Sequence, residues 1–399
     1  MGPPTTAELR TLVDAETDRM VDLRRDLHRH PELGFAETRT TARIAETART
    51  LGLDALPCPT ATGSVWSLDG GRPGGTVLLR ADIDALPIEE AADIEFASEE
   101  PGRMHACGHD AHTAQLLGAA AALARRAEDL PGRYVFLFQP AEEGIGGATA
   151  MIEGGVLDGL DPAAVVGCHV ASIVPTGLVG VRAGIAMSAA RALRVDVHGI
   201  GGHGAAYQDG ANPLTAAARL ALRLDGVVDG LSLEGTGCAC TAGILRAGTA
   251  VNVIPSHATV SGTLRTFTPD HTATALERLR ALLAELEADT GCRFELTQTG
   301  HTPAVTNHVG VTGLVRAAAV EAVGAGAVVD LPPVSPSDDV AEFLDRIPGS
   351  YFFVGAGRSD GTSGMHHNPG FAIDEACMPI AATVLAASAV RAASPSPSY

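Results

Sequence analysis

Four short apolar segments, each followed by polar residues, constrain the fold of this chain more than any other feature. They occupy residues 76–80, 134–138, 164–167 and 351–354, and helical stretches separate the first three. Strands that alternate with helices predict an α/β domain with a largely parallel, buried sheet. Open α/β sheets bind their ligands at the carboxyl ends of the strands. We therefore expect a functional site among the polar residues that follow these strands: Asp82, Asp84, Glu142, Glu143, His169, His366 and His367.

A different pattern fills residues 188–300. Strand-like and helical segments there follow the order β-α-β-β-α-β, which is typical of a ferredoxin-like α+β sandwich. We interpret 188–300 as a domain inserted into the first, so that the first domain comprises residues 1–187 and 301–399. A stripe of apolar residues also predicts one opening helix over residues 9–27.

Charge and composition narrow the class of partner. The chain contains 28 basic and 47 acidic residues, which give a net charge of -19, and it has no basic cluster. Nucleic acids and anionic membranes are therefore poor partners, and a small-molecule substrate is expected. All the basic residues are arginine, and the absence of lysine excludes Schiff-base enzymes, the Walker phosphate loop and carbamylated-lysine metal sites.

Three features bear on the cellular location. The seven cysteines are odd in number and scattered along the chain. The segment MGPPTTAELR lacks the apolar core of a signal peptide, and no apolar run approaches about 18 residues. We therefore expect a cytoplasmic protein that does not span a membrane.

The segment MHACGHDAH, residues 104–112, is the densest group of metal-binding side chains. Cys107 and His109 lie two residues apart, so both side chains point to one face if the segment is extended. A thiolate and an imidazole together suit a borderline cation such as zinc. The alternative is a surface histidine cluster that caps the following helix through Asp110.

Two adjacent carboxylates, Glu142 and Glu143, follow the second strand. Neighbouring residues generally cannot fill the same ligand position, so one can bind a metal while the other acts as a general base. The alternative is a solvated acidic turn. A lone strand-end histidine such as His169 is more often structural, but four such elements at one sheet edge favour a common site.

Taken together with other motifs along the chain, these segments make the sequence resemble the M20 metallopeptidases. Within that family, it is most similar to the amidohydrolase branch of aminoacylases, hippurate hydrolases and indole-acetyl-amino-acid hydrolases. The resemblance runs from about residue 22 to about residue 387 and is carried, in the family's order, by HRHPELGF, LRADIDALPI, MHACGHDAHTAQLLGAA, FQPAEEGIGGA, GCHV, GGHGA, NVIPSHATVSGTLR and HNPGF. It implies a zinc-exopeptidase-like catalytic domain with two divalent metal ions, and a smaller lid domain through which the chain forms a homodimer.

The resemblance also implies roles for particular residues. Glu142 would be the general base, and the metal ligands would be Cys107, His109, Glu143, His169 and His367. His367 is preferred to His366 because His367-Asn368-Pro369 satisfies the family's His-x-Pro spacing. We interpret Asp82 as a residue that orients a ligand histidine or the neighbouring loop.

In the lid, the resemblance implies that His203 reaches the partner subunit's active site and stabilises the oxyanion. Asn252 resembles a residue that contacts substrate, and Arg265 is our candidate for binding the substrate carboxylate. The chain departs from many relatives at Tyr207-Gln208, where Pro-His is usual, and at Asn212-Pro213, where Asp-Pro is usual. These departures predict that the substrate-facing loop of the lid differs from that of the relatives, so substrate preference is the property of the family that transfers least to this chain.

The sequence therefore predicts hydrolysis of the amide bond of an N-acyl amino acid or a related conjugate. The cofactors would be two divalent ions, drawn from zinc, manganese, nickel and cobalt. A dipeptidase or an N-carbamoyl-amino-acid hydrolase would use the same metals on another group. A metal-binding protein without catalysis is a third possibility, against which the presence of Glu142 argues.

Overall fold

A computed structural model describes residues 2–144, 146–205 and 211–394 of the chain. It divides into two units. The first consists of Met1–Gly184, Thr306–Leu331 and Asp339–Tyr399, and the second of Ile185–Val305 and Pro332–Asp338. No helix among the described residues is long and apolar enough to cross a membrane.

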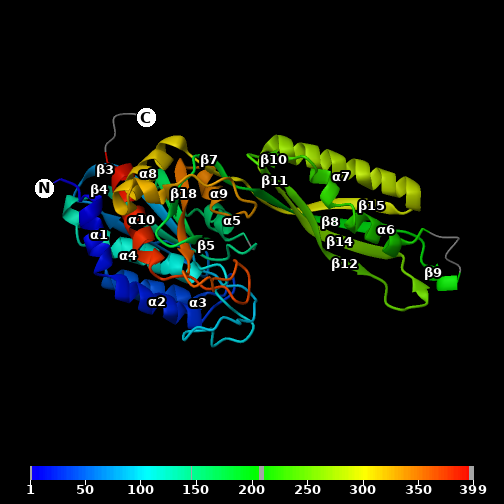
Figure 1. The fold of residues 1–399 in the computed structure, drawn as a ribbon, viewed down its shortest axis with the longest axis horizontal. Coiled ribbons are helices and arrows are strands. Elements are labelled where there is room, and N and C mark those ends of the chain that lie inside the picture. The colour runs from blue at the N-terminus through cyan, green and yellow to red at the C-terminus, as the bar shows by residue number, and fades with distance from the viewer. Residues whose placement is uncertain (1, 145, 206–210, 395–399) are drawn as a thin grey trace. The chain divides into compact units, whose positions relative to one another are not determined.

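An eight-stranded sheet forms the centre of the first unit (Figure 1). The order of its strands is β1-β2-β4-β3-β5-β18-β6-β17. The four central strands are mutually parallel, as predicted, and each contains one of the four apolar segments. They are β3 (Arg72–Asp82), β4 (Pro131–Gln139), β5 (Pro162–Pro175) and β18 (Gly349–Gly357). The shorter strands are β1 (Asp54–Leu56), β2 (Ser64–Asp69), β6 (Val179–Gly180) and β17 (Val328–Val329).

Helices cover both faces of this sheet. A large apolar core joins one face to α1 (Thr6–Asp14), α2 (Thr17–Arg29), α4 (His109–Ala124), α8 (Val309–Val323) and α10 (Cys377–Ala393). A smaller core joins the other face to α5 (Gly147–Glu153) and α9 (Ala341–Leu344). Helix α3 (Thr38–Thr50) adds Ile44 and Ala48 to the large core.

Helix α4 is buried over almost its whole length and packs against α2 and α10. Small side chains make this packing possible, because a Cβ atom added to Gly118 would lie 2.1 Å from the sulfur of Met20. The alanine-rich sequence of α4 is therefore required by close helix packing. Burial of the helix also fixes its first turn, where His109 and Asp110 lie.

The opening segment differs from the prediction of one helix over residues 9–27. The structure has two helices, α1 and α2, which are separated at Ala15 and Glu16. Glu16 is buried and its carboxylate pairs with Arg125 and Arg19. The break between the helices thus places Glu16 beside its arginine partners. Because Arg125 is distant in the sequence, the stripe of apolar residues does not reveal this contact.

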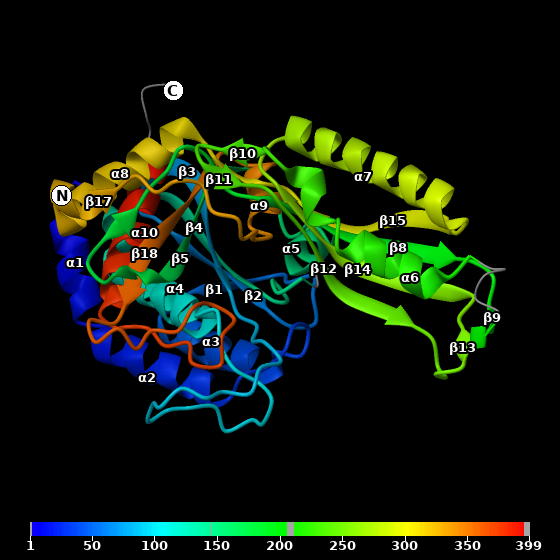
Figure 2. The same ribbon diagram turned by 45° about the vertical axis from the view of Figure 1, so that its right-hand side comes forward.

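A four-stranded antiparallel sheet and two α-helices form the core of the second unit (Figure 2). The chain order is β8 (Ala189–His198), α6 (Pro213–Ala221), β12 (Ala239–Ala247), β14 (His257–Thr266), α7 (Pro269–Thr290) and β15 (Arg293–Thr302). The sheet order is β12-β14-β8-β15, and both helices share an apolar core with it.

The second unit extends beyond the inserted domain drawn from the sequence: it includes residues 185–187 and 301–305 and, in addition, a separate segment. Residues 332–338, which we assigned to the first domain, belong to the second unit. Their backbone pairs with the start of that unit, because Val334 donates a hydrogen bond to the carbonyl of Ala186 at 2.9 Å and accepts one from Ser188 at 3.1 Å. A segment of seven residues is too short for the pattern of apolar residues to show which unit it belongs to.

Candidate metal centre

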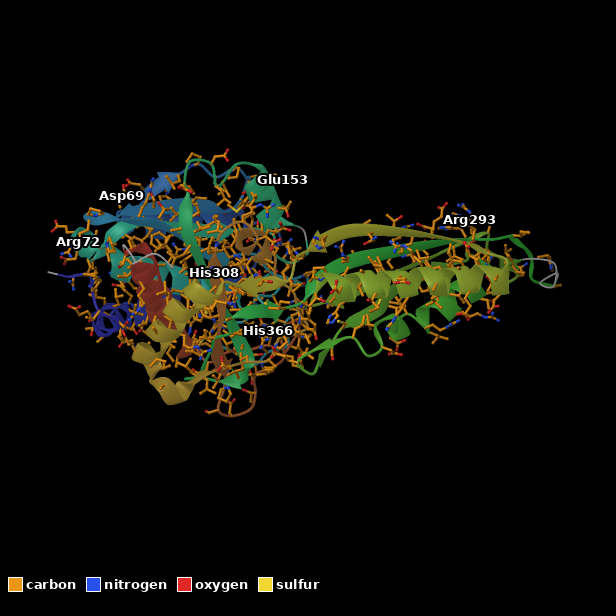
Figure 3. The ribbon with its side chains drawn as sticks, turned by 90° about the horizontal axis from the view of Figure 1, so that it is seen from above. Asp69, Arg72, Glu153, Arg293, His308 and His366 are labelled. Atoms are coloured by element: carbon orange, nitrogen blue, oxygen red, sulfur yellow. The ribbon has the colours of Figure 1, made fainter. Side chains whose placement is uncertain are left out.

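The carboxyl ends of the central strands bring the predicted side chains of the first unit together. Asp82 ends β3, Gln139 ends β4 and leads into Glu142 and Glu143, and His169 lies within β5. The loop that follows β18 supplies His366, which is labelled in Figure 3. Because β3, β4, β5 and β18 are parallel, these residues reach the same edge of the sheet.

Cys107 belongs to two groups of metal-binding side chains. Its sulfur lies 3.6 Å from Nε2 of His169 and 3.7 Å from Nδ1 of His366. It also forms a group with His109 and Glu143, and the ligand atoms of each group lie within 4.8 Å of one another. The thiol of Cys107 therefore lies close to two sets of metal-binding side chains.

Two ligand atoms in this cluster make no hydrogen bond among the described residues. They are Nε2 of His109 and Oε1 of Glu143, both buried and 3.9 Å apart, although the second also lies 3.2 Å from Nε2 of His367. A buried polar atom without a partner is costly, and a cation between such atoms removes the cost. Thiolate, imidazole and carboxylate donors suit borderline divalent cations. The residues present therefore fit a divalent metal site.

The cysteine segment is buried, which contradicts the alternative of a surface histidine cluster. Gly108 is the N-cap of α4, with a φ of 90° that favours glycine. Asp110 does not cap the helix, and its carboxylate accepts a hydrogen bond from Arg24 at 3.0 Å and contacts Nδ1 of His28 at 2.8 Å. Burial raises the pKa of the Cys107 thiol to about 12, so the thiolate form needs a cation beside it.

Asp84 orients two of the predicted ligands. Its Oδ1 lies 3.1 Å from Nδ1 of His109, which leaves Nε2 of that ring facing Glu143. Its Oδ2 accepts a hydrogen bond from the backbone N–H of Glu143 at 3.0 Å. Burial opposes a charged imidazole, but Asp82 and the bond to Asp84 outweigh it and raise the pKa of His109 well above its usual value.

Asp82 acts on a different histidine. Its Oδ1 lies 2.6 Å from Nδ1 of His112, and its Oδ2 accepts a hydrogen bond from Arg80 at 2.6 Å. Nε2 of His112 accepts the N–H of Val170 at 3.0 Å, so both of its ring nitrogens have partners, although the ring also forms a group of metal-binding side chains with His109 and His169. Sequence reasoning missed the roles of Asp84 and His112, although both stand inside the quoted motifs.

His169 is held by its own strand. Its Nδ1 lies 2.7 Å from the carbonyl of Val170, so that Nε2 is directed at Cys107. The ring packs on that of His112, with the centroids 4.6 Å apart. Burial, together with the charges of His112 and His366, lowers the pKa of His169 well below its usual value. The neutral imidazole is the form that binds a metal.

The adjacent carboxylates have different surroundings. Oε1 of Glu143 lies 3.2 Å from Nε2 of His367 and 3.9 Å from Nε2 of His109. Oε1 of Glu142 instead accepts a hydrogen bond from the backbone N–H of Asp339 at 3.3 Å. The turn that carries both begins at Ala141, which has a φ of 55°, a left-handed conformation that is rare outside glycine.

The loop after β18 brings two histidines to the cluster. His366 contacts Cys107, and its Nε2 accepts the N–H of Ser172 at 3.3 Å. His367, the residue chosen from the His-x-Pro spacing, contacts Glu143 and has a left-handed φ of 61°. Sequence spacing alone gives no signal for the contact between His366 and Cys107.

In the second unit, the structure brings His203 and Asn252 together. β9 (Gly202–His203) pairs with β13 (Val253–Ile254), and the N–H of Gly204 donates to the carbonyl of Asn252 at 2.9 Å. Both residues are exposed. Tyr207 and Gln208, where the chain departs from its relatives, lie outside the described residues.

Arg265 does not lie beside Asn252 within one chain. Asn252 precedes the first residue of β14, His257, and Arg265 lies near the other end of that strand. At about 3.3 Å per residue, His257 and Arg265 are separated by roughly 26 Å along the strand. Arg265 donates a hydrogen bond to Oγ of Ser337 at 3.0 Å.

Comparison with known proteins gives consistent matches. The sequence model of the peptidase family M20/M25/M40 matches residues 78–391. An N-acetyl-L-cysteine deacetylase of Bacillus subtilis is 38% identical over 373 residues, which cover 94% of this chain and 88% of the relative. A thermostable carboxypeptidase of Saccharolobus solfataricus is 34% identical over 382 residues, covering 94% of this chain and 95% of the relative.

A solved structure agrees with the sequence matches. A Bacillus subtilis protein described as a dinuclear metal binding peptidase of the M20 family superposes with a TM-score of 0.80 at 31% identity. The match covers 95% of this chain and 98% of that one. The resemblance inferred from the motifs is therefore confirmed.

Proposed function

The chain belongs to the peptidase family M20/M25/M40, and from this premise we propose that it hydrolyses the amide bond of N-acyl amino acids. The observation that carries the proposal is the position of the Cys107 thiol, which joins His169 and His366 on one side and His109 and Glu143 on the other. The ligands of two divalent cations would be Cys107, His109, Glu143, His169 and His367, and His366 is a further donor beside the thiol.

Two divalent cations at these groups supply Lewis-acid chemistry, which polarises the amide carbonyl and lowers the pKa of a water molecule from about 15.7 towards about 7. Glu142 then acts as the general base: it removes a proton from the attacking water and later delivers it to the leaving amine. The hydrogen bond from the N–H of Asp339 supports this role, because it gives Glu142 a partner that differs from those of Glu143, which are His109 and His367.

The second unit would act as a lid of ferredoxin-like topology, through which two chains form a homodimer. His203 would stabilise the oxyanion in the partner subunit's site, and Asn252, which lies beside it, would contact the substrate. Arg265 stays a candidate for the substrate carboxylate. Removal of one oxyanion donor typically lowers turnover by about 10²–10³, so His203 would contribute strongly.

The deacetylase relative supports an acyl group on the amino acid nitrogen, and the carboxypeptidase relative favours a peptide as the second candidate substrate. An N-carbamoyl amino acid stays a third. We further propose zinc, manganese, cobalt or nickel as the metal, and the cytoplasm as the location. All seven cysteines are free, which is compatible with a reducing compartment.

One experiment tests the activity and the metal together. Purified protein is depleted by exhaustive chelation, and each of the four metals is restored separately. Release of free amine is then measured from N-acetyl, N-benzoyl and longer N-acyl amino acids, from dipeptides and from N-carbamoyl amino acids. We expect no turnover without metal and fastest turnover on an N-acyl amino acid. Full activity after chelation contradicts the metal role, and a preference for dipeptides favours the second candidate.

A further inference from the structure

The turn that carries Glu142 and Glu143 contains a disfavoured backbone conformation. Ala141 is fully buried and has a φ of 55°. In this left-handed region the Cβ atom of a residue other than glycine comes too close to a carbonyl oxygen, so the surrounding structure must hold it in place. Ala141 directly precedes Glu142, so its conformation decides the direction in which the Glu142 side chain leaves the backbone.

Two buried carboxylates bind the backbone on either side of Glu142. Oε1 of Glu37 accepts the N–H of Ala141 at 2.9 Å, and Oδ2 of Asp84 accepts the N–H of Glu143 at 3.0 Å. The carbonyl of Ala141 accepts the N–H of Gly147 at 3.0 Å, so both backbone polar groups of Ala141 are hydrogen-bonded. The general base is thus flanked by two backbone amides that donate to carboxylates from distant parts of the chain.

Glu37 is not itself one of the predicted metal ligands. It is fully buried at the start of α3, 104 residues before Ala141, and its Oε2 accepts the hydroxyl of Thr62 at 2.6 Å. It belongs to none of the groups of metal-binding side chains. Burying a carboxylate is costly unless its hydrogen bonds are made, and here one of them is made to the disfavoured residue of the turn.

We propose that Glu37 is a positioning residue for the reaction: it holds Ala141 in the left-handed conformation and thereby directs Glu142 at the attacking water. This inference rests on the proposed function, in which Glu142 is the general base. It predicts that loss of Glu37 lowers the rate of the chemical step while the metals and the substrate still bind.

The test compares Glu37→Ala with Glu37→Gln. In Glu37→Gln the amide oxygen can still accept the N–H of Ala141, and its NH₂ group can donate to Oγ1 of Thr62. Because misplacement of a reacting group by about 1 Å can cost about 10²-fold, we expect Glu37→Ala to lower kcat by about 10- to 100-fold. KM and metal content should stay within about twofold of wild type, and Glu37→Gln should keep kcat within about threefold.

A second variant separates positioning from general stability. Glycine adopts a positive φ without the Cβ penalty, so Ala141→Gly in the Glu37→Ala background should restore kcat by about threefold or more. Glu16→Ala removes another buried carboxylate of the same unit, one that pairs with Arg19 and Arg125 and does not touch the turn. It controls for destabilisation and should leave kcat unchanged.

Three outcomes decide the matter. If Glu37→Ala keeps wild-type kcat while Glu142→Gln is inactive, the positioning role is wrong and the general base stands. If Glu142→Gln is fully active, the proposed function itself fails. If Glu37→Ala loses metal in parallel with activity, or if Glu37→Gln and Ala141→Gly give no recovery, Glu37 is a structural residue only.

Discussion

Oδ1 of Asp84 lies 3.1 Å from Nδ1 of His109, while Oδ2 of the same carboxylate accepts the backbone N–H of Glu143 at 3.0 Å. One side chain therefore fixes the ring of one predicted ligand and the backbone of another. Nε2 of His109 and Oε1 of Glu143 are in consequence directed at each other. This relationship makes Asp84 a residue on which metal affinity should depend.

We expect Asp84→Ala to weaken metal binding by about 10- to 100-fold, because ligands that lose their orienting partners bind less tightly. Asp84→Asn should lie between this variant and wild type, since its one amide oxygen cannot accept both N–H groups. Competition with a chelator of known affinity measures the effect. Restoration of activity by excess metal is expected, and unchanged affinity in Asp84→Ala would contradict the orienting role.

The neighbouring carboxylates should respond differently to the same substitution. Glu142→Gln should keep its metal and bind substrate but lose most of its turnover, because an amide cannot accept the proton. Glu143→Gln should lose metal as well, since this side chain faces His109 and His367. Elemental analysis and kcat, measured on the same samples, distinguish the two. Equal metal loss in both variants would exclude the division of roles.

The proposed action of His203 across a dimer predicts complementation. His203→Ala and Glu142→Gln homodimers should each be nearly inactive. In a random mixture, half of the dimers contain one chain of each kind, and each such dimer has one site with an intact base and an intact lid histidine. Activity should therefore recover to about a quarter of wild type on two-state counting of subunit pairs.

Co-refolding of the two variants, followed by measurement of amide hydrolysis, checks this prediction. If His203 served its own subunit, every site in the mixture would lack one group and no activity would return. Sedimentation of the wild-type protein comes first, because a monomer would rule out the arrangement before any mixing.

The ion pairs between α2 and α3 predict a dependence of stability on pH. Asp26 accepts hydrogen bonds from Arg39 at 2.8 Å and from Arg43 at 3.0 Å. Partial burial opposes the charged form, but the two arginines outweigh it and hold the pKa of Asp26 below its usual value. A lowered carboxyl pKa stabilises the folded state above the unfolded pKa of about 3.9, and this contribution is lost as the pH falls through the folded value.

Asp26→Asn should therefore lower the free energy of unfolding by about 0.5–1 kcal/mol at pH 6.5, a small effect because the pairs are partly exposed to solvent. The difference from wild type should shrink as the pH falls from 5 to 3. Urea unfolding at several pH values measures it. A difference that stays constant over this range would assign the effect to packing.

The amino-acid sequence determined the sheet and the edge on which the site lies. Apolar segments such as 134–138 are buried strands because they match the needs of a sheet covered on both faces. The order of the motifs then indicated the family and predicted Cys107, His109, Glu143 and His169 as metal ligands. The fold brings these four side chains together. These features follow from local pattern, which is why they can be predicted.

Only the tertiary structure decided how the cluster is held and aimed. Glu37 reaches Ala141 across 104 residues of chain, and Asp84 reaches Glu143 across 59. The contact of His366 with Cys107 and the inclusion of residues 332–338 in the second unit likewise depend on segments distant in sequence. A single sequence shows which side chains are present. It does not show which backbone N–H groups a buried carboxylate will bind, because these come from segments that only the folded structure brings beside it.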